Sequence, residues 1–409
     1  MAYSAYVHSV IEKVAQFEID HVVFVAREGY LFQKIYDILT AHSPESVSLN
    51  VTTHYAYLSQ VSTFLPSVSH LSTRELVQTT GTAGQRGLWE TFVALGLPPE
   101  EFAPLAQTYG IDLLEPIEDY WNRQNLLSFL SDDRVQARVS RYQRQSHQLL
   151  AQYLKQCGFF GRDRKVALVD IGWEGAIQDN LVRAFGQRAD FPLLHGLYFA
   201  RRERQRLLEY SSSFSHGLIY ESRNRDINAE SVNAFVDIFE KGAIAPHAAT
   251  TGYVPVSDLL SEGVRPVFEP DSSASRQAEI QSNGAVSVMQ RGILDFATQY
   301  AQQWQSQGFS VSDSLPFVRG LMARHVAYPT YQEALHVATQ LDSALKTPHE
   351  DSPSKLAMTA SAFWAQVKGH DIETAIACLK DTSWPLGSLR LLRIPGLMSL
   401  YRIKRFLSF

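Results

Sequence analysis

Short apolar runs rich in branched residues alternate along this chain with longer stretches whose apolar positions recur at helical spacing. Such runs, bounded by turn residues, are typical of strands buried on both faces of a sheet. They predict strands at residues 21–26, 165–170, 192–200 and 216–220, with a further strand region at 49–60. Helical periodicity directly follows two of these runs, at 30–41 and 176–186. Strands that alternate with helices predict an α/β fold with a parallel, Rossmann-like sheet joined by right-handed crossovers.

The rest of the chain has mainly helical periodicity, which predicts the domain organisation. A long helix at 133–157, ended by Gly158, belongs to a helical block between the two halves of the sheet. Prolines and serines predict a loop at 266–285. Later helices are expected at 286–307, 314–326, 330–346 and 354–380. We therefore expect an α/β core at 1–71 and 160–222, a helical insertion at 72–159, a mostly helical C-terminal region at 223–383 and a basic amphipathic tail at 384–409.

The composition narrows the class of protein. Of 409 residues, 45% are hydrophobic and 19% are charged, which excludes a disordered chain. A formal net charge of −5 gives no electrostatic basis for a nucleic-acid partner. Two cysteines cannot make a disulfide framework or a four-thiolate zinc site, which favours a reducing cytoplasm. We find no signal-peptide pattern, and no run reaches the ~18 apolar residues that a membrane span requires.

The segment 384–409 carries an uneven share of the charge. It holds five cations and no acid among many apolar side chains. Two interpretations are open: an amphipathic helix lying in a membrane interface, or a C-terminal helix docked on the protein's own core. We favour the first, which predicts a cytoplasmic protein peripheral to the inner face of the cytoplasmic membrane.

The strongest candidate for chemistry follows the best-defined strand. Asp170 stands at the end of this strand, and Gly172 and Gly175 enclose Trp173 and Glu174 in a sharp turn before a helix. Glycine lets the backbone approach a ligand closely, and a helix N-terminus favours an anion such as phosphate. In open α/β sheets, ligands bind outside the carboxyl ends of the strands. The alternative interpretation is an ordinary turn in which Asp170 caps the helix.

A second candidate follows the first strand. Arg27 and Glu28 stand directly before Gly29 and Tyr30 at the carboxyl end of this strand. Arg27 can bind an anion bidentately, and Glu28 can hold Arg27 or a metal ion. Isolated pairs of this kind are more often surface salt bridges. Because both charged turns should lie on the same edge of one sheet, we expect them to share a ligand site.

His247 is the third candidate. It follows a proline among small residues, after a predicted helix that carries Asp237 and Glu240. A histidine in such a place can act as a general base or contact a phosphate, although a lone loop histidine is more often structural. Tyr55 and Tyr57 end the second strand region, where they either line a pocket or belong to the core.

Several catalytic motifs are absent from the sequence. It contains no P-loop, no Gly-x-Ser-x-Gly elbow and no His-Glu-x-x-His metal motif. The Asp-x-Asp pair that haloacid-dehalogenase phosphatases carry after an N-terminal strand is also absent. These absences argue against a P-loop NTPase, an α/β-hydrolase and a phosphatase, and they leave the ligands of any metal ion undetermined.

Five segments, taken in order, resemble one known family. They read VAREGYLFQKIYD, YAYLSQ, VDIGWEGAIQ, APHAATTGY and YPTYQEA, and they fall within residues 20–340. The family consists of bacterial polysaccharide-biosynthesis proteins that are often labelled predicted hydrolases of the haloacid-dehalogenase type, beside or fused to glycosyltransferase modules. Its hydrolase label belongs to a separate phosphatase domain, so phosphatase activity is not carried over. The remaining part resembles a type I phosphoribosyltransferase core.

The resemblance implies a glycosyltransferase of O-antigen or capsule synthesis. Such an enzyme would move a 5-phosphoribosyl group from phosphoribosyl pyrophosphate, bound with Mg²⁺, to a sugar hydroxyl of a lipid-linked or oligosaccharide glycan. A separate phosphatase would then remove the 5-phosphate to leave ribofuranose. The implied catalytic residues are Asp170, Arg27, Glu28, His247, Glu240 and Asp237, and the implied donor-binding residues are Gly29, Tyr30, Gly172, Trp173, Glu174, Gly175 and Gln178.

The same resemblance suggests individual roles. Arg27 would stabilise the leaving pyrophosphate, and Asp170 would hold the ribose hydroxyls, while the turn at 172–175 would hold the 5-phosphate. His247, Glu240 or Asp237 would be the base for the acceptor hydroxyl. Two other functions stay open: a nucleotide-sugar glycosyltransferase with two Rossmann-like domains, and a non-catalytic scaffold for a glycosyltransferase or phosphatase partner.

Overall fold

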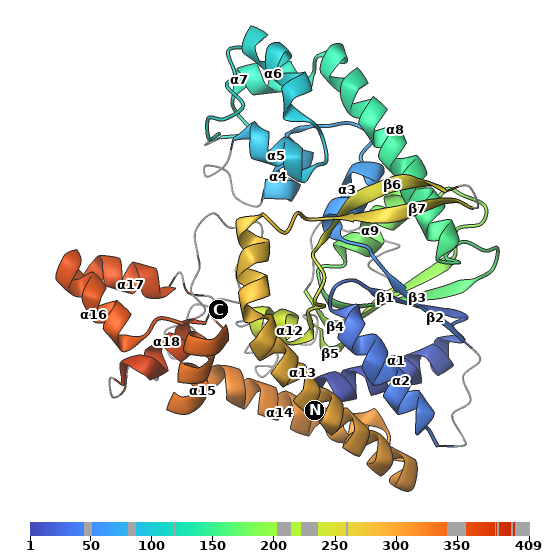
Figure 1. Ribbon diagram of the computed structural model, residues 1–409, viewed down its shortest axis with the longest axis vertical. Helices are drawn as coiled ribbons and strands as arrows, with labels where there is room; N and C mark the ends of the chain where they lie inside the picture. The colour runs from blue at the N-terminus through green and yellow to red at the C-terminus, as the bar shows by residue number, and fades with distance from the viewer. Residues whose placement is uncertain are drawn as a thin grey trace.

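A five-stranded parallel sheet organises the chain in the computed structural model (Figure 1). The structure describes residues 1–44, 51–80, 87–117, 119–202, 214–221, 236–258, 261–341, 357–380, 382, 384–393 and 396. The strands are β1 (His21–Val25), β2 (Thr52–Ala56), β3 (Lys165–Trp173), β4 (Leu193–Arg201) and β5 (Ser215–Glu221). Their order is β2-β1-β3-β4-β5, and every neighbouring pair is parallel. The predicted parallel α/β sheet is therefore confirmed.

Alternate residues of the central strands enter two different hydrophobic clusters. Val22 and Phe24 of β1 share a cluster with residues of two N-terminal helices, whereas Val23 and Val25 share one with helices on the other face. Successive strand residues point to opposite faces, so a sheet covered on both sides requires an uninterrupted apolar run. The covering helices are α1 (Ala2–Phe17) and α2 (Gly29–Ala41) on the first face and α8 (Asp133–Gln156) and α9 (Ala176–Phe185) on the second.

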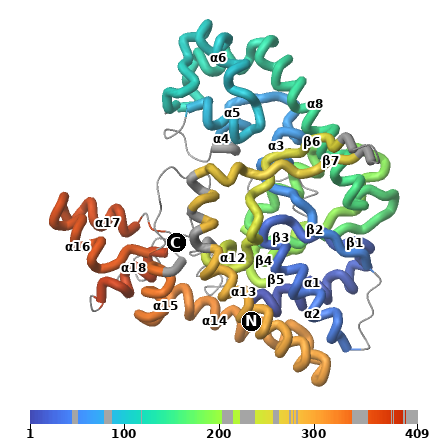
Figure 2. The backbone as a smooth tube through the Cα atoms, in the orientation of Figure 1, coloured from blue at the N-terminus to red at the C-terminus, as the bar shows by residue number. Residues whose placement is uncertain are grey.

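The helical insertion has a hydrophobic cluster of its own. Figure 2 shows its short helices as a lobe beyond one edge of the sheet. They are α4 (Thr73–Thr80), α5 (Leu88–Ala94), α6 (Pro99–Thr108) and α7 (Gln124–Leu130), preceded by α3 (Gln60–Ser67). The cluster extends from Phe64 to Val139, whereas Leu150 and Tyr153 of α8 pack with the sheet. The predicted long helix is thus confirmed as α8, and it joins the two cores.

The C-terminal region differs most from its prediction at one place. An antiparallel hairpin of β6 (Thr250–Asp258) and β7 (Ser261–Phe268) lies within the region for which the sequence predicts mostly helix. The predicted loop at 266–285 is confirmed only at 269–273, because β7 continues to Phe268 and α13 begins at Ala274. Pro266, one of the residues that predict this loop, lies in β7, because proline is tolerated in a two-stranded ribbon whose edges are not all paired. Ser273 caps α13 through its hydroxyl, which accepts a hydrogen bond from the Arg276 N–H at 3.2 Å.

Helices make up most of the remaining described part of this region, as predicted, but the single helix expected at 354–380 is divided into two, at 360–369 and 372–380. The helices at 274–307 and 311–327 pack against α1, and the later helices lie farther from the sheet, at the left of Figure 1. The bounds of the helices of this region are α12 (Val236–Ala243), α13 (Ala274–Gln307), α14 (Val311–Ala327), α15 (Tyr331–His336) with its π-helical continuation (Val337–Leu341), α16 (Ala360–Gly369), α17 (Ile372–Lys380) and α18 (Pro385–Leu392).

The first part of the basic tail is docked on the protein itself. α18 buries Leu386, Leu389 and Leu391, and the buried Trp384 donates a hydrogen bond from Nε1 to the Val326 carbonyl at 2.8 Å. Residues 394–395 and 397–409 lie outside the described residues, so membrane contact by that part stays a prediction. Among the described helices, we find none with the length and apolar character needed to span a bilayer.

Candidate functional site

The two charged turns lie side by side at the point where the strand order reverses. β1 pairs with β2 on one side and with β3 on the other, and Phe24 is in register with Val169. Arg27 and Glu28 follow β1, while the segment from Asp170 belongs to β3. Open α/β sheets bind ligands at such a switch point, outside the carboxyl ends of the strands. The expectation that both turns share one edge is therefore confirmed.

The glycine turn after β3 is shorter than predicted. β3 continues to Trp173, so Asp170 lies within the strand rather than at its end. Gly172 has φ of +120°, and a Cβ there would lie 1.9 Å from the Ala200 carbonyl oxygen of β4. Strand packing alone therefore requires Gly172 to be glycine. Gly175, with φ of +70°, precedes α9, and the peptide bonds Ala26–Arg27 and Gly172–Trp173 are cis.

Asp170 is almost fully buried at this edge. Its Oδ1 accepts a hydrogen bond from the Ile171 N–H at 2.8 Å. Burial raises the pKa of the Asp170 carboxyl well above its usual range, and the carboxylates of Glu28 and Glu240 raise it further. Backbone hydrogen bonds oppose this shift only in part. Asp170 therefore keeps its proton to an unusually high pH, which is a common property of functional carboxyls in clefts.

Trp173 connects α12 to the end of β3 through a side-chain hydrogen bond. Its Nε1 donates a hydrogen bond to Oε1 of Glu240 at 2.7 Å, and the Arg202 guanidinium lies 5.2 Å from its ring centroid. The predicted residues Glu240 and Trp173 thus come together, close to Asp170. Asp237 also belongs to α12, but its side chain lies outside the described residues.

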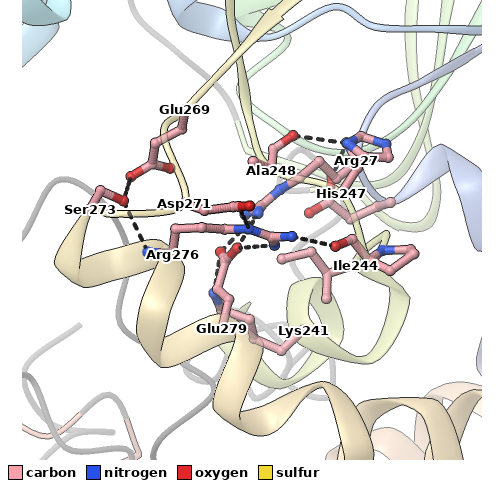
Figure 3. Close-up of polar contacts among 12 residues, drawn as sticks. Arg27, Lys241, Ile244, His247, Ala248, Glu269, Asp271, Ser273, Arg276 and Glu279 are labelled. Atoms are coloured by element: carbon pink, nitrogen blue, oxygen red, sulfur yellow. Dashed lines mark hydrogen bonds and ion pairs between the residues drawn. The ribbon is translucent and has the colours of Figure 1, made fainter.

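Arg27 makes an ion pair, through a single guanidinium nitrogen, with a residue far away in the sequence. Its Nη1 lies 2.8 and 2.7 Å from Oε1 and Oε2 of Glu279 on α13 (Figure 3). Two further cations contact the same carboxylate: Lys241 Nζ at 3.7 Å and Arg276 Nη1 at 3.2 Å. Burial raises the pKa of Glu279, but these cations outweigh it and the net direction is downward.

Sequence reasoning missed Lys241, Arg276 and Glu279. Arg276 and Glu279 were placed in a loop, and Lys241 follows Glu240 without any motif. One usable signal was present, because Ser273 three residues before Arg276 is a good N-cap and predicts a helix start. On that helix Arg276 and Glu279 are one turn apart and share a face.

His247 is held in one defined protonation state. Its Nδ1 lies 2.8 Å from the Ala248 carbonyl, which can only accept, so Nδ1 carries the proton. Its Nε2 then accepts a hydrogen bond from the Tyr55 hydroxyl at 2.7 Å. Burial lowers the pKa of His247, with Arg27 and Arg276 acting in the same direction. His247 is therefore neutral near pH 7, and it lies beside the second predicted pocket residue, Tyr57.

Gln178 does not face a ligand. It is completely buried, its Nε2 donates to the Leu194 carbonyl at 3.0 Å, and its Oε1 accepts from Tyr198 at 2.9 Å and Ser215 at 2.7 Å. The amide is used in packing α9 against β4 and β5. The structure therefore gives Gln178 a packing role, and its polar atoms are already satisfied inside the protein, which does not favour the predicted donor-binding role.

Gln178→Met is expected to lower the free energy of unfolding by about 2 kcal/mol. Methionine fills a similar volume but leaves the hydroxyls of Tyr198 and Ser215 buried without this acceptor, which typically costs ~1–3 kcal/mol. Urea unfolding of both proteins measures the difference. Unchanged stability would show that the amide is not needed for packing and would reopen a ligand role.

The other predicted binding residues differ in accessibility. Gly29 is buried at the start of α2, and Tyr30 is half-buried, with its hydroxyl accepting a hydrogen bond from Lys34 Nζ at 2.8 Å. Glu174 is exposed in the turn before α9. Of these three, Tyr30 and Glu174 can be reached by a ligand.

A polar cavity of about 90 Å³ lies beside the first turn of α9. Its walls come from α3, α4 and α9 and from the segment between α3 and α4. The lining includes Ala176, the first residue of α9, and the guanidinium-bearing side chains of Arg74 and Arg183. Acidic side chains also line it, and Arg183 pairs with Asp179 at 2.8 Å. The cavity thus lies between α9 and the start of the helical insertion, and its lining on this side begins at Ala176, just after the glycine turn.

No cluster of three or more histidine, cysteine, aspartate or glutamate side chains suited to a metal ion occurs among the residues that the structure describes. The carboxylates of Glu28 and Glu240 are nevertheless near enough to Asp170 to raise the pKa of its carboxyl. Comparison with known proteins found no family model and no curated protein that matches the chain.

Proposed function

We propose that this protein is a glycosyltransferase of bacterial surface-polysaccharide synthesis that uses phosphoribosyl pyrophosphate as donor and a glycan hydroxyl as acceptor. The observation that carries the proposal is the pair of turns, at Arg27 and Asp170, on the two strands that flank the switch point. The donor has a diphosphate at one end, a 5-phosphate at the other and two hydroxyls between them. The arginine turn provides a partner for the diphosphate, the helix N-terminus one for the 5-phosphate, and the Asp170 carboxyl one for the hydroxyls.

The reaction exchanges one bond at C1 of the ribose. The bond from C1 to the pyrophosphate oxygen breaks, its electron pair leaves with the pyrophosphate, and C1 bonds to the acceptor oxygen. Arg27 stabilises the negative charge that grows on the leaving group. Asp170 forms hydrogen bonds with the ribose hydroxyls. It would stabilise the positive charge that develops at C1 once its carboxyl has released its proton to solvent, a loss that the raised pKa makes costly.

His247 is the best placed of the three predicted bases. Its neutral ring has an unprotonated Nε2, which is the state a base requires. That nitrogen accepts a hydrogen bond from Tyr55, so Tyr55 must exchange this contact for the acceptor hydroxyl. Glu240 is already engaged with the Trp173 indole. The acceptor proton therefore goes to Nε2 of His247.

The 5-phosphate belongs at the first turn of α9 in this proposal. The free N–H groups of a helix N-terminus favour an anion, and Arg74 and Arg183 line the cavity beside this turn. Mg²⁺ takes one or two carboxylates plus substrate phosphate oxygens, so the acidic set fits it without a preformed cage. Asp170 and Glu28 would hold it with the pyrophosphate, where it would neutralise charge on the leaving group.

The acceptor and the location follow from the same proposal. A lipid-linked glycan would bring the reaction to the inner face of the cytoplasmic membrane, and separate phosphatase and glycosyltransferase modules would complete the product. A nucleotide-sugar enzyme with two Rossmann-like domains is less well supported, because the described ranges contain one parallel sheet and one antiparallel hairpin.

Thermal unfolding with candidate donors tests the proposal. A ligand at a hundredfold excess over its Kd that binds only the folded state stabilises it by ~2.7 kcal/mol. We expect this effect with phosphoribosyl pyrophosphate and Mg²⁺, and none with UDP- or GDP-sugars. Stabilisation by a nucleotide sugar instead would show that the donor is a nucleotide sugar. Stabilisation by none of these ligands would favour a non-catalytic scaffold.

A further inference from the structure

Three cationic side chains from separate elements converge on one carboxylate at the switch point (Figure 3). Arg27 comes from the turn after β1, Lys241 from α12 and Arg276 from α13, and all three lie within 4 Å of Glu279. Their side chains are 14%, 4% and 9% exposed, against 5% for Glu279. The cluster is thus close to the protein interior, at the edge where ligands of such sheets bind.

This arrangement exceeds what an ordinary ion pair needs. One carboxylate balances one cation, and buried charges are costly unless they are closely paired. Lys241 illustrates the cost, because burial lowers the pKa of its amine and the Glu279 carboxylate is the strongest factor that opposes this shift. Glu240 and Glu28 act on Lys241 in the same direction as Glu279. Arg276 also pairs with Asp271, but that carboxylate is exposed, so Glu279 is the buried partner that all three cations share. A doubly or triply charged oxyanion could engage the three cations together, as Glu279 does.

Arg276 links this cluster to the loop that carries His247. Its Nη2 donates to the Pro246 carbonyl at 2.6 Å, and its Nε lies 3.2 Å from the exposed carboxylate of Asp271. A ligand that rearranges Arg276 therefore also acts on the segment just before His247. The cations are in this way connected to both predicted parts of the site, the arginine turn and the base.

We propose that Arg27, Lys241 and Arg276 form a clamp for the diphosphate group of the donor, and that Glu279 competes with this anion for the same cations. The identity of the donor rests on the proposed function, whereas the clamp requires only a diphosphate. Binding exchanges ion pairs and changes no covalent bond. Diphosphate oxygens replace the Glu279 carboxylate at Arg27 Nη1 and Lys241 Nζ, since both carboxylate and phosphate accept bidentate hydrogen bonds from arginine.

Glu279→Gln tests the competition through the sign of its effect. Glutamine keeps the shape of the side chain and gives up the charge that competes with the ligand. Titration calorimetry with inorganic pyrophosphate and Mg²⁺ should therefore show at least about tenfold tighter binding than in the native protein. If Glu279 instead serves only to orient Arg27 and Arg276, binding becomes weaker, and that result or an unchanged affinity overturns the proposal.

Two further variants guard against loss of folding and general charge effects. Lys241→Met removes one buried cation while keeping most of the apolar stem, and it should weaken pyrophosphate binding at least about tenfold. An unchanged affinity in Lys241→Met overturns the clamp even if Glu279→Gln does not fold. Glu333→Gln is the matched control, because Glu333 forms a bidentate pair with Arg324 on other helices, and it should leave the affinity unchanged.

The clamp and the proposed function can fail separately. If pyrophosphate binding responds to both variants as expected but phosphoribosyl pyrophosphate causes no stabilisation, the clamp stands and the donor is another diphosphate. If phosphoribosyl transfer occurs and its donor KM is unaffected by both variants, the function stands and the clamp is wrong.

Discussion

Asparagine in place of Asp170 should make the protein more stable and should strongly slow the phosphoribosyl transfer that we propose for it. Asparagine keeps the shape and the acceptor oxygen that the Ile171 N–H requires, but it cannot ionise. We expect a gain of about 1 kcal/mol in the free energy of unfolding near pH 8, in the range of other stabilising replacements. We also expect a loss of about 10²–10³-fold in the rate of transfer, as for other groups that stabilise developing charge.

The stability effect has a definite pH dependence. Burial and the neighbouring Glu28 and Glu240 raise the pKa of Asp170 in the folded protein above the unfolded value of about 3.9. Between these two values the folded state binds one more proton than the unfolded state, so stability falls as pH rises. The asparagine variant lacks this loss. Its advantage should be near zero at pH 4 and should grow toward the folded pKa.

Urea unfolding of both proteins at pH 5 and pH 8, with transfer assays on the same samples, measures both effects. An advantage that is equal at both pH values would mean that Asp170 titrates alike in the folded and unfolded states. Full transfer activity in the variant would remove Asp170 from the proposed mechanism, whatever its effect on stability.

Glutamine in place of Arg27 should weaken binding of phosphoribosyl pyrophosphate about 100-fold. Hydrogen bonds to charged groups contribute ~1.5–3 kcal/mol, and glutamine can replace neither the charge nor the planar fork of the guanidinium. Glu279 retains its contacts with Lys241 and Arg276, so the fold should persist. Arg27→Lys should show an intermediate loss, because lysine keeps the charge but not the bidentate geometry.

Donor affinity from calorimetry and the KM for transfer check this prediction. The control is Arg188→Gln, which removes a guanidinium from a bidentate pair, with Asp190 on the surface, and should leave donor affinity unchanged. A loss of the same size in both variants would indicate a general charge effect. An unchanged affinity in Arg27→Gln would remove the arginine turn from the donor site.

Local sequence determined the strands of the parallel sheet and most of the helices of this protein. The apolar runs at 21–26 and 165–170 predict buried strands because a sheet covered on both faces needs no polar alternation, and both became neighbouring strands of the sheet. Gly158 marks the end of the long helix because it adopts a left-handed conformation that other residues avoid. The sequence also placed Arg27 and Asp170 at one edge of the sheet, because the carboxyl ends of neighbouring parallel strands lie at the same edge.

Only the tertiary structure decided what these residues contact. Arg27 and Glu279 are 252 positions apart, and no local pattern links them. Gly172 must be glycine because β4 approaches it closely, and Gln178 is buried because β4 and β5 surround it. The sequence alone does not show these neighbours, so there both residues resemble ligand-binding residues. The hairpin at 250–268 was not predicted, because the free-energy cost of proline in a strand depends on which edge of that strand is paired. These contacts depend on burial and on pairing between segments that are distant in the sequence. Such burial and pairing arise only when the chain folds, so no local pattern can reveal them.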